Sequence, residues 1–181
     1  MLKILEQGKY NYKPDEMIYF LKRLSQLNKN MKIKLSVHNN KILSESVNKI
    51  KKDLRGGLVD PKIGSLAFYL KELGVVKDHE LWTMMGDYVM EDNFKQLFNE
   101  SVNGIKGLSV LQNYLPRAKF DKIYHKIERI CLITIWEVNM VHYRDIAMAL
   151  AEVGRDSEQV FKTLESHIMS NLSMEYSVEY V

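Results

Sequence analysis

Within residues 79–172, an aliphatic residue followed by an aromatic one recurs in segments whose apolar residues have the spacing of a helix. Three pairs carry the pattern: Leu81-Trp82, Ile123-Tyr124 and Val160-Phe161. By subtraction of residue numbers the aromatics recur after 42 and then 37 residues, and each begins an apolar stripe with helical spacing. A helical unit repeated at such a period is typical of a helical-repeat protein.

A second type of helix alternates with the first and has its own aligned apolar positions. The first type gains a fourth member at Leu43, 39 residues before Trp82. Three columns define the second type: Met17, Leu66, Leu108 and Ile146; Phe20, Tyr69, Leu111 and Ala149; Leu24, Leu73, Leu115 and Val153. A small or helix-stopping residue follows each member at one equivalent position: Ser25, Gly74, Pro116 and Gly154.

These columns predict an all-α protein, a right-handed α-solenoid of about four irregular helix-turn-helix repeats of roughly 37–42 residues. The alternative is a compact helical bundle whose amphipathic helices look alike by chance. The predicted organisation is an N-terminal lead-in at 1–14, a repeat domain at 15–172 and a C-terminal tail at 173–181. The tail alternates polar and apolar residues, so it is either loose or a strand that pairs with something outside the chain.

Local signals place several helix ends. Pro14 opens a helix well, because proline suits the first turn. Asn40 and Asp78 are expected to cap the helices that follow them. A helix from Ser101 is expected to run through Leu115 and to close at Pro116.

Charge is divided unevenly along the chain. Residues 1–77 hold 16 Lys and Arg against 7 Asp and Glu, a net charge of +9, and the remainder carries 10 against 16, or −6. A basic half could face a polyanion, although both halves could equally be solvated surfaces. Basic residues off the apolar stripes are the candidate RNA-binding residues: Lys29, Lys32, Lys34, Lys49, Lys51, Lys52, Arg55, Lys106 and Arg144.

Two segments carry a resemblance to a known type of protein: GSLAFYLKELGVVKDHELWTMM at 64–85 and DIAMALAEVGRDSEQVFKTLESHI at 145–168. Each segment begins with a helix of aliphatic and small residues. A glycine comes next, then a polar capping residue, and then an aliphatic-aromatic pair. This run resembles the organellar α-solenoid families with FAST kinase-like, octotricopeptide and heptatricopeptide helical repeats. The resemblance implies RNA binding or a place in a ribonucleoprotein assembly, usually in mitochondria or plastids.

Motifs for catalysis or metal binding are missing from the sequence. Gly104 and Gly107 lack the spacing of a phosphate-binding loop, and the five histidines show no metal-ligand pattern. Cys131 falls in an apolar column, which favours a small buried hydrophobe over a nucleophile. We therefore expect no enzyme, no cofactor and no metal, and no apolar run is long enough to span a bilayer.

The sequence leads to two hypotheses for function. The first is a non-catalytic RNA-associated protein, a component of a mitochondrial ribonucleoprotein such as the mitochondrial ribosome, with ribosomal RNA or an organellar transcript and other protein subunits as partners. The second is a protein-only scaffold or accessory subunit of a large mitochondrial complex, which the acidic second half favours. The mitochondrial location follows from the repeat type alone, since no targeting peptide is visible.

Overall fold

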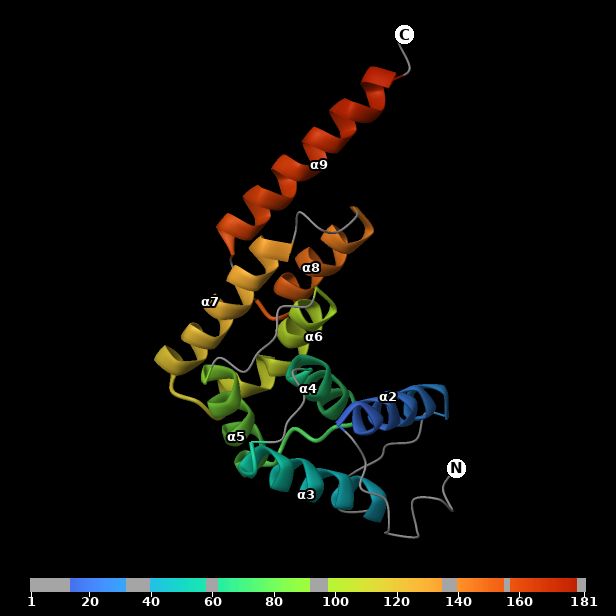
Figure 1. Ribbon diagram of the computed structural model, residues 1–181, viewed down its shortest axis with the longest axis vertical. Coiled ribbons are helices and arrows are strands. Elements are labelled where there is room, and N and C mark those ends of the chain that lie inside the picture. Colours follow the sequence, from blue (N-terminus) through green and yellow to red (C-terminus); the bar gives the residue numbers. More distant parts are fainter. Residues whose placement is uncertain are drawn as a thin grey trace.

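The computed structural model describes residues 14–31, 40–57, 62–91, 98–134, 140–154 and 157–178 (Figure 1). Over these residues the secondary structure is α-helical apart from one short 3-10 helix, and no strand is present. The prediction of an all-α protein is therefore confirmed. Residues 1–13 of the predicted lead-in at 1–14 lie outside the described residues, and Pro14 already belongs to the first described helix.

Eight α-helices and one 3-10 helix make up the described part of the chain. In order they are α2 (Pro14–Met31), α3 (Lys41–Arg55), α4 (Ile63–Glu72), α5 (His79–Met90), α6 (Phe98–Leu108), η1 (Ser109–Asn113), α7 (Arg117–Thr134), α8 (Met140–Glu152) and α9 (Glu158–Val178).

The predicted caps and stops are largely confirmed. The side chain of Asn40 accepts from the amide of Leu43 at 3.1 Å, and that of Asp78 accepts from Leu81 at 3.0 Å. Gly74 and Gly154 follow their helices with φ of 75° and 66°, a conformation that glycine adopts without steric cost. These ends are set by short-range hydrogen bonds, which is why a single sequence can locate them.

Three boundaries differ from the prediction. Helix α2 does not end at Ser25 but continues to Met31, because serine in a buried position does not force the backbone out of a helix. The helix expected to run from Ser101 through Leu115 begins at Phe98 and tightens into η1 after Leu108. Residues 173–178 belong to α9, so the alternative that this part of the predicted tail forms a strand is wrong.

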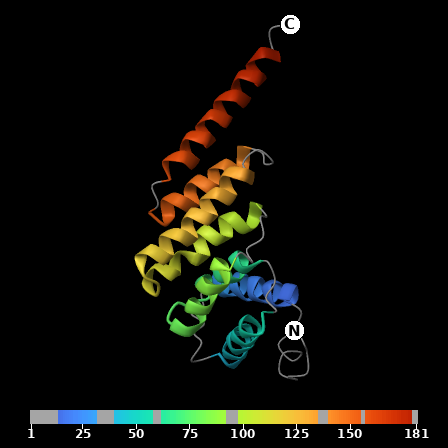
Figure 2. The ribbon, with the colours of Figure 1, turned by 60° about the vertical axis from the view of Figure 1, so that its left-hand side comes forward.

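The helices contact one another in two rows. In one row α2 packs on α4, α4 on α6 and α6 on α8; in the other α3 packs on α5, α5 on α7 and α7 on α9. Consecutive helices join the rows, as between α6 and α7. Figure 1 and Figure 2 show an elongated molecule in which α9 projects from one end.

A continuous apolar core lies between the two rows. The aligned positions Leu43, Trp82 and Tyr124 are fully buried, whereas Phe161 at the equivalent place in α9 is partly buried. The second-type column of Met17, Leu66, Leu108 and Ile146 is buried throughout. The columns read from the sequence therefore correspond to the core.

The backbones of α4 and α6 approach each other closely at Gly107. A Cβ added at Gly107 would stand 2.3 Å from the backbone nitrogen of Phe68, so only glycine fits there. Polar bonds flank this point: Asn103 donates to the Ser65 hydroxyl at 2.8 Å, and Lys71 donates to the Lys106 carbonyl at 2.9 Å. The Lys71 ammonium thus satisfies a carbonyl that is exposed where α6 gives way to the 3-10 turn.

Candidate interaction surfaces

Chemistry-bearing side chains are scattered over the described residues. No group of three or more His, Cys, Asp and Glu in that part of the chain could hold a metal ion. Cys131 is fully buried in α7. None of the helices that the structure describes combines the length and the apolar character needed to cross a membrane.

Most of the predicted RNA-binding cations are paired with carboxylates. Lys32 and Lys34 lie outside the described residues. Six of the other seven form ion pairs: Lys29 with Glu72, Lys49 with Asp53, Lys51 with Asp78 and Glu80, Arg55 with Glu80, Lys106 with Glu152, and Arg144 with Asp145. Lys52 is exposed on α3 and has no ion-pair partner among the described side chains. The seven described cations lie on four helices, with four of them on α3, so they do not form one patch.

Lys51, Arg55, Asp78 and Glu80 form a charged cluster between α3 and the start of α5. The Lys51 ammonium lies 2.8 Å from Asp78 Oδ2 and 2.9 Å from Glu80 Oε2, and its side chain is only 14% exposed. Arg55 pairs with the other oxygen of Glu80. Asp78 also caps α5, so the cluster fixes where α5 begins relative to α3.

The cluster changes the proton affinity of two of its members. Partial burial opposes the charged form of Lys51, but the hydrogen bonds and charges of Asp78 and Glu80 outweigh it and raise the pKa of the ammonium. Hydrogen bonds from Lys51 and Arg55, followed by their charges, lower the pKa of Glu80. Both shifts favour the ionised pair, so the cluster stabilises the packing of α3 on α5 near neutral pH.

Replacing Glu80 by glutamine is expected to lower the Tm at pH 7. The gap in Tm between the variant and the unsubstituted protein is expected to shrink as the pH falls. Because folding lowers the pKa of Glu80 below its ordinary 4.5, this stabilisation is complete above that pH and is lost as the pH falls through the lowered value. Thermal melts followed by circular dichroism between pH 7 and 3 measure the gap. Glu165→Gln, at an exposed position on α9, is the matched control. A gap that stays constant down to pH 3 would contradict this interpretation.

Other polar bonds also join helices that are next but one in the chain. Lys119 of α7 pairs with Asp87 of α5, and Lys126 of α7 donates to the Val89 carbonyl at 2.8 Å. Lys106 of α6 lies 3.2 Å from Glu152 of α8. Charged side chains therefore connect neighbouring helices within both rows.

Packing explains why an aromatic residue recurs at this position of the repeat. Trp82 Nε1 donates to the Val75 carbonyl at 2.8 Å, and the Tyr124 hydroxyl donates to the Ile105 carbonyl at 2.5 Å. Both rings are fully buried; the first bond leads to the connection between α4 and α5, and the second leads to α6. They cannot stack on a nucleic-acid base without unfolding, which confirms the interpretation of these two residues as core.

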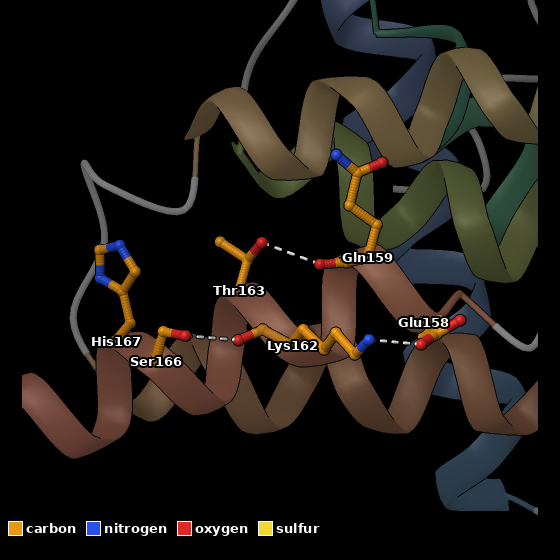
Figure 3. Close-up of a pocket in the computed structure, with 6 residues that line it drawn as sticks. All are labelled: Glu158, Gln159, Lys162, Thr163, Ser166 and His167. Carbon is orange, nitrogen blue, oxygen red and sulfur yellow. Dashed lines mark hydrogen bonds and ion pairs between the residues drawn. The ribbon is translucent and has the colours of Figure 1, made fainter.

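An open depression of about 520 Å³ lies along α9. Its lining residues all come from that helix: Glu158, Gln159, Lys162, Thr163, Ser166 and His167. Several of them bond within α9, since Thr163 donates to the Gln159 carbonyl, Ser166 donates to the Lys162 carbonyl, and Lys162 pairs with Glu158 at 2.5 Å (Figure 3). Because its walls come from a single helix, the depression lacks the converging groups of a ligand site.

One exposed surface was missed by the sequence reasoning. Tyr19, Lys22, Arg23 and Gln26 are all exposed on one side of α2, opposite the apolar positions that pack on α4. The available signal was the position of Lys22 and Arg23 outside the apolar stripe of that helix. Periodicity shows which side of a helix is exposed, but it does not show which exposed charges lack partners.

Comparisons with protein-family models, with curated proteins and with solved structures found no match to this chain.

Proposed function

We propose that the chain is a right-handed α-solenoid of about four irregular repeats that acts, without catalysis, as an RNA-associated component of a mitochondrial ribonucleoprotein such as the mitochondrial ribosome. The observation that carries the proposal is the order of helix contacts, in which each helix packs on the next but one in both rows. Repeats stacked in this way form an extended surface suited to a macromolecule rather than an enclosed site suited to a small substrate.

Two further observations support RNA as the ligand. The segments at 64–85 and 145–168 resemble organellar RNA-associated repeats, and the first 77 residues carry a net charge of +9. Helix α3 alone holds five basic residues against two acidic ones. An excess of positive charge attracts RNA over a distance even where individual cations also bind carboxylates.

The protein is expected to bind single-stranded RNA with an affinity that falls steeply with salt. Each phosphate contact contributes about 0.7 to the slope of log K against log salt concentration. Fluorescence anisotropy with a labelled 20-nucleotide oligouridylate, titrated between 50 and 300 mM KCl, measures the slope. Absence of binding at 50 mM KCl would contradict direct RNA contact.

The alternative proposal is a protein-only scaffold or accessory subunit of a large mitochondrial complex. The ion pairs of the predicted cations favour it, because a Lys51 held by Asp78 and Glu80 is less available to a phosphate. Affinity purification of the tagged protein from mitochondria, with and without nuclease, separates the two. A set of co-purifying proteins that survives nuclease supports the scaffold, and one that is lost with the RNA supports the ribonucleoprotein.

A further inference from the structure

The exposed side of α2 presents a combination of side chains not repeated on the other described helices. Tyr19, Lys22, Arg23 and Gln26, here called the α2 outer face, follow the spacing i, i+3, i+4 and i+7 and share one side of the helix. All four are exposed. Figure 1 shows α2 at the end of its row, with α4 on one side of it.

Tyr19 is the only exposed Phe, Tyr or Trp among the residues whose side chains the structure describes. It is 52% exposed, whereas Trp82 and Tyr124 are fully buried. An exposed aromatic ring can be covered by a stacked base without any rearrangement of the core. Every nucleobase has a flat face that can stack on such a ring.

Arg23 holds the ring of Tyr19 in place. Its Nε donates to the Tyr19 hydroxyl at 3.0 Å, its Nη1 donates to the Gln26 side-chain oxygen at 3.1 Å, and the guanidinium carbon lies 5.2 Å from the centre of the ring. Two flat groups are thus fixed next to each other before any ligand arrives. Such preorganisation lowers the entropy that binding would cost.

The charges of this face are not neutralised by acids. Neither Lys22 nor Arg23 forms an ion pair with a carboxylate among the described residues, in contrast to Lys29 on the same helix, which pairs with Glu72. The guanidinium bonds only to a phenol and an amide, both uncharged. The face therefore keeps two positive charges beside an exposed ring.

We infer that the α2 outer face contacts single-stranded RNA, with a base stacked on Tyr19 and Arg23 and a neighbouring phosphate held by Lys22. The inference rests on the proposed RNA association and assigns its contact to this face rather than to the ion-paired cations. Stacking on an aromatic or guanidinium plane combined with a backbone cation is the usual chemistry of single-strand binding, and it tolerates any base sequence.

The experiment compares four variants of the full chain in the oligouridylate assay. Tyr19→Ala is expected to raise the Kd about 5- to 150-fold, the range that loss of one stacked base produces. Tyr19→Phe keeps the ring and is expected to stay within about 3-fold of the unsubstituted protein. Lys22→Gln is expected to lower the salt slope by about 0.7. Lys122→Gln removes an exposed lysine on α7 that is not among the candidate RNA-binding residues, and it is expected to leave the slope unchanged.

Each outcome decides between the proposals. If the unsubstituted protein binds no RNA, the proposed RNA association fails and this inference fails with it. If RNA binds but Tyr19→Ala and Lys22→Gln bind as tightly as the unsubstituted protein, the α2 outer face is not the contact and the RNA association stands. If Tyr19→Ala releases a nuclease-resistant protein from the purified complex and leaves RNA affinity unchanged, the face binds protein instead. The three substituted positions, 19, 22 and 122, are exposed, so unchanged thermal melts are expected to exclude unfolding as the cause.

Discussion

Replacing Gly107 by alanine is expected to lower the free energy of unfolding by about 2 to 3 kcal/mol, although alanine is the better helix former. The new Cβ would lie 2.3 Å from the backbone nitrogen of Phe68 and 2.7 Å from the carbonyl carbon of Ala67. Backbone atoms in the middle of α4 cannot rotate away as a side chain can. Helix α6 would have to move off α4, loosening the contacts that both helices make with the core.

Gly86→Ala is the matched control for this prediction. Its added Cβ would meet the Cδ1 atom of Leu115 at 2.8 Å, the far end of a flexible side chain. The gain of about 1 kcal/mol in helix propensity should then roughly cancel the cost of shifting that side chain. Urea unfolding followed by far-UV circular dichroism gives both values. Equal stability of the two variants would show that α4 and α6 do not approach as closely as described.

Replacing Trp82 by alanine is expected to cost about 3 to 5 kcal/mol, the usual loss for truncating a large buried aromatic. Trp82 is fully buried at the centre of the first-type column, and its indole satisfies the Val75 carbonyl. The substitution opens a cavity and leaves that carbonyl without its donor. A loss of this size is a large part of the 5 to 15 kcal/mol that stabilises an ordinary domain.

Trp82→Phe separates the two contributions. The phenyl ring fills much of the space but cannot donate a hydrogen bond, so a loss of about 1 to 2 kcal/mol is expected. The same urea titration measures it. If Trp82→Ala costs less than about 1 kcal/mol, the aliphatic-aromatic pair is not a core element and the repeat interpretation loses its physical basis.

The sequence was sufficient for those parts of the fold that depend on neighbours in the chain. Asn40 and Asp78 cap their helices through bonds to amides three residues away, and Gly74 takes the positive φ that its neighbours require. The buried columns follow from spacing alone, because a helix shows one side to the core. Serine at position 25 misled the prediction, since it permits a stop without imposing one.

What could not be predicted depends on residues far apart in the sequence. The need for glycine at position 107 arises from the crossing with Phe68, and nothing in the local sequence distinguishes Gly107 from Gly104. The candidate RNA-binding cations were chosen by charge alone, whereas their carboxylate partners come from other helices, as with Lys51 and Glu80. The α2 outer face was overlooked because its distinguishing feature is that Lys22 and Arg23 form no ion pair with the described carboxylates. The sequence does not show which carboxylates the fold brings near a given cation.

The two-row arrangement also bears on how the chain reaches its native state. The side-chain bonds that join α4 to α6, or α7 to α5, span only 32 to 38 residues. Loops of this length close at modest entropic cost, so the α4–α6 crossing can form early and recruit the helices on each side one after another. Folding would then spread outward from the middle of the molecule, and the outermost helices would be the last to join and the first to leave.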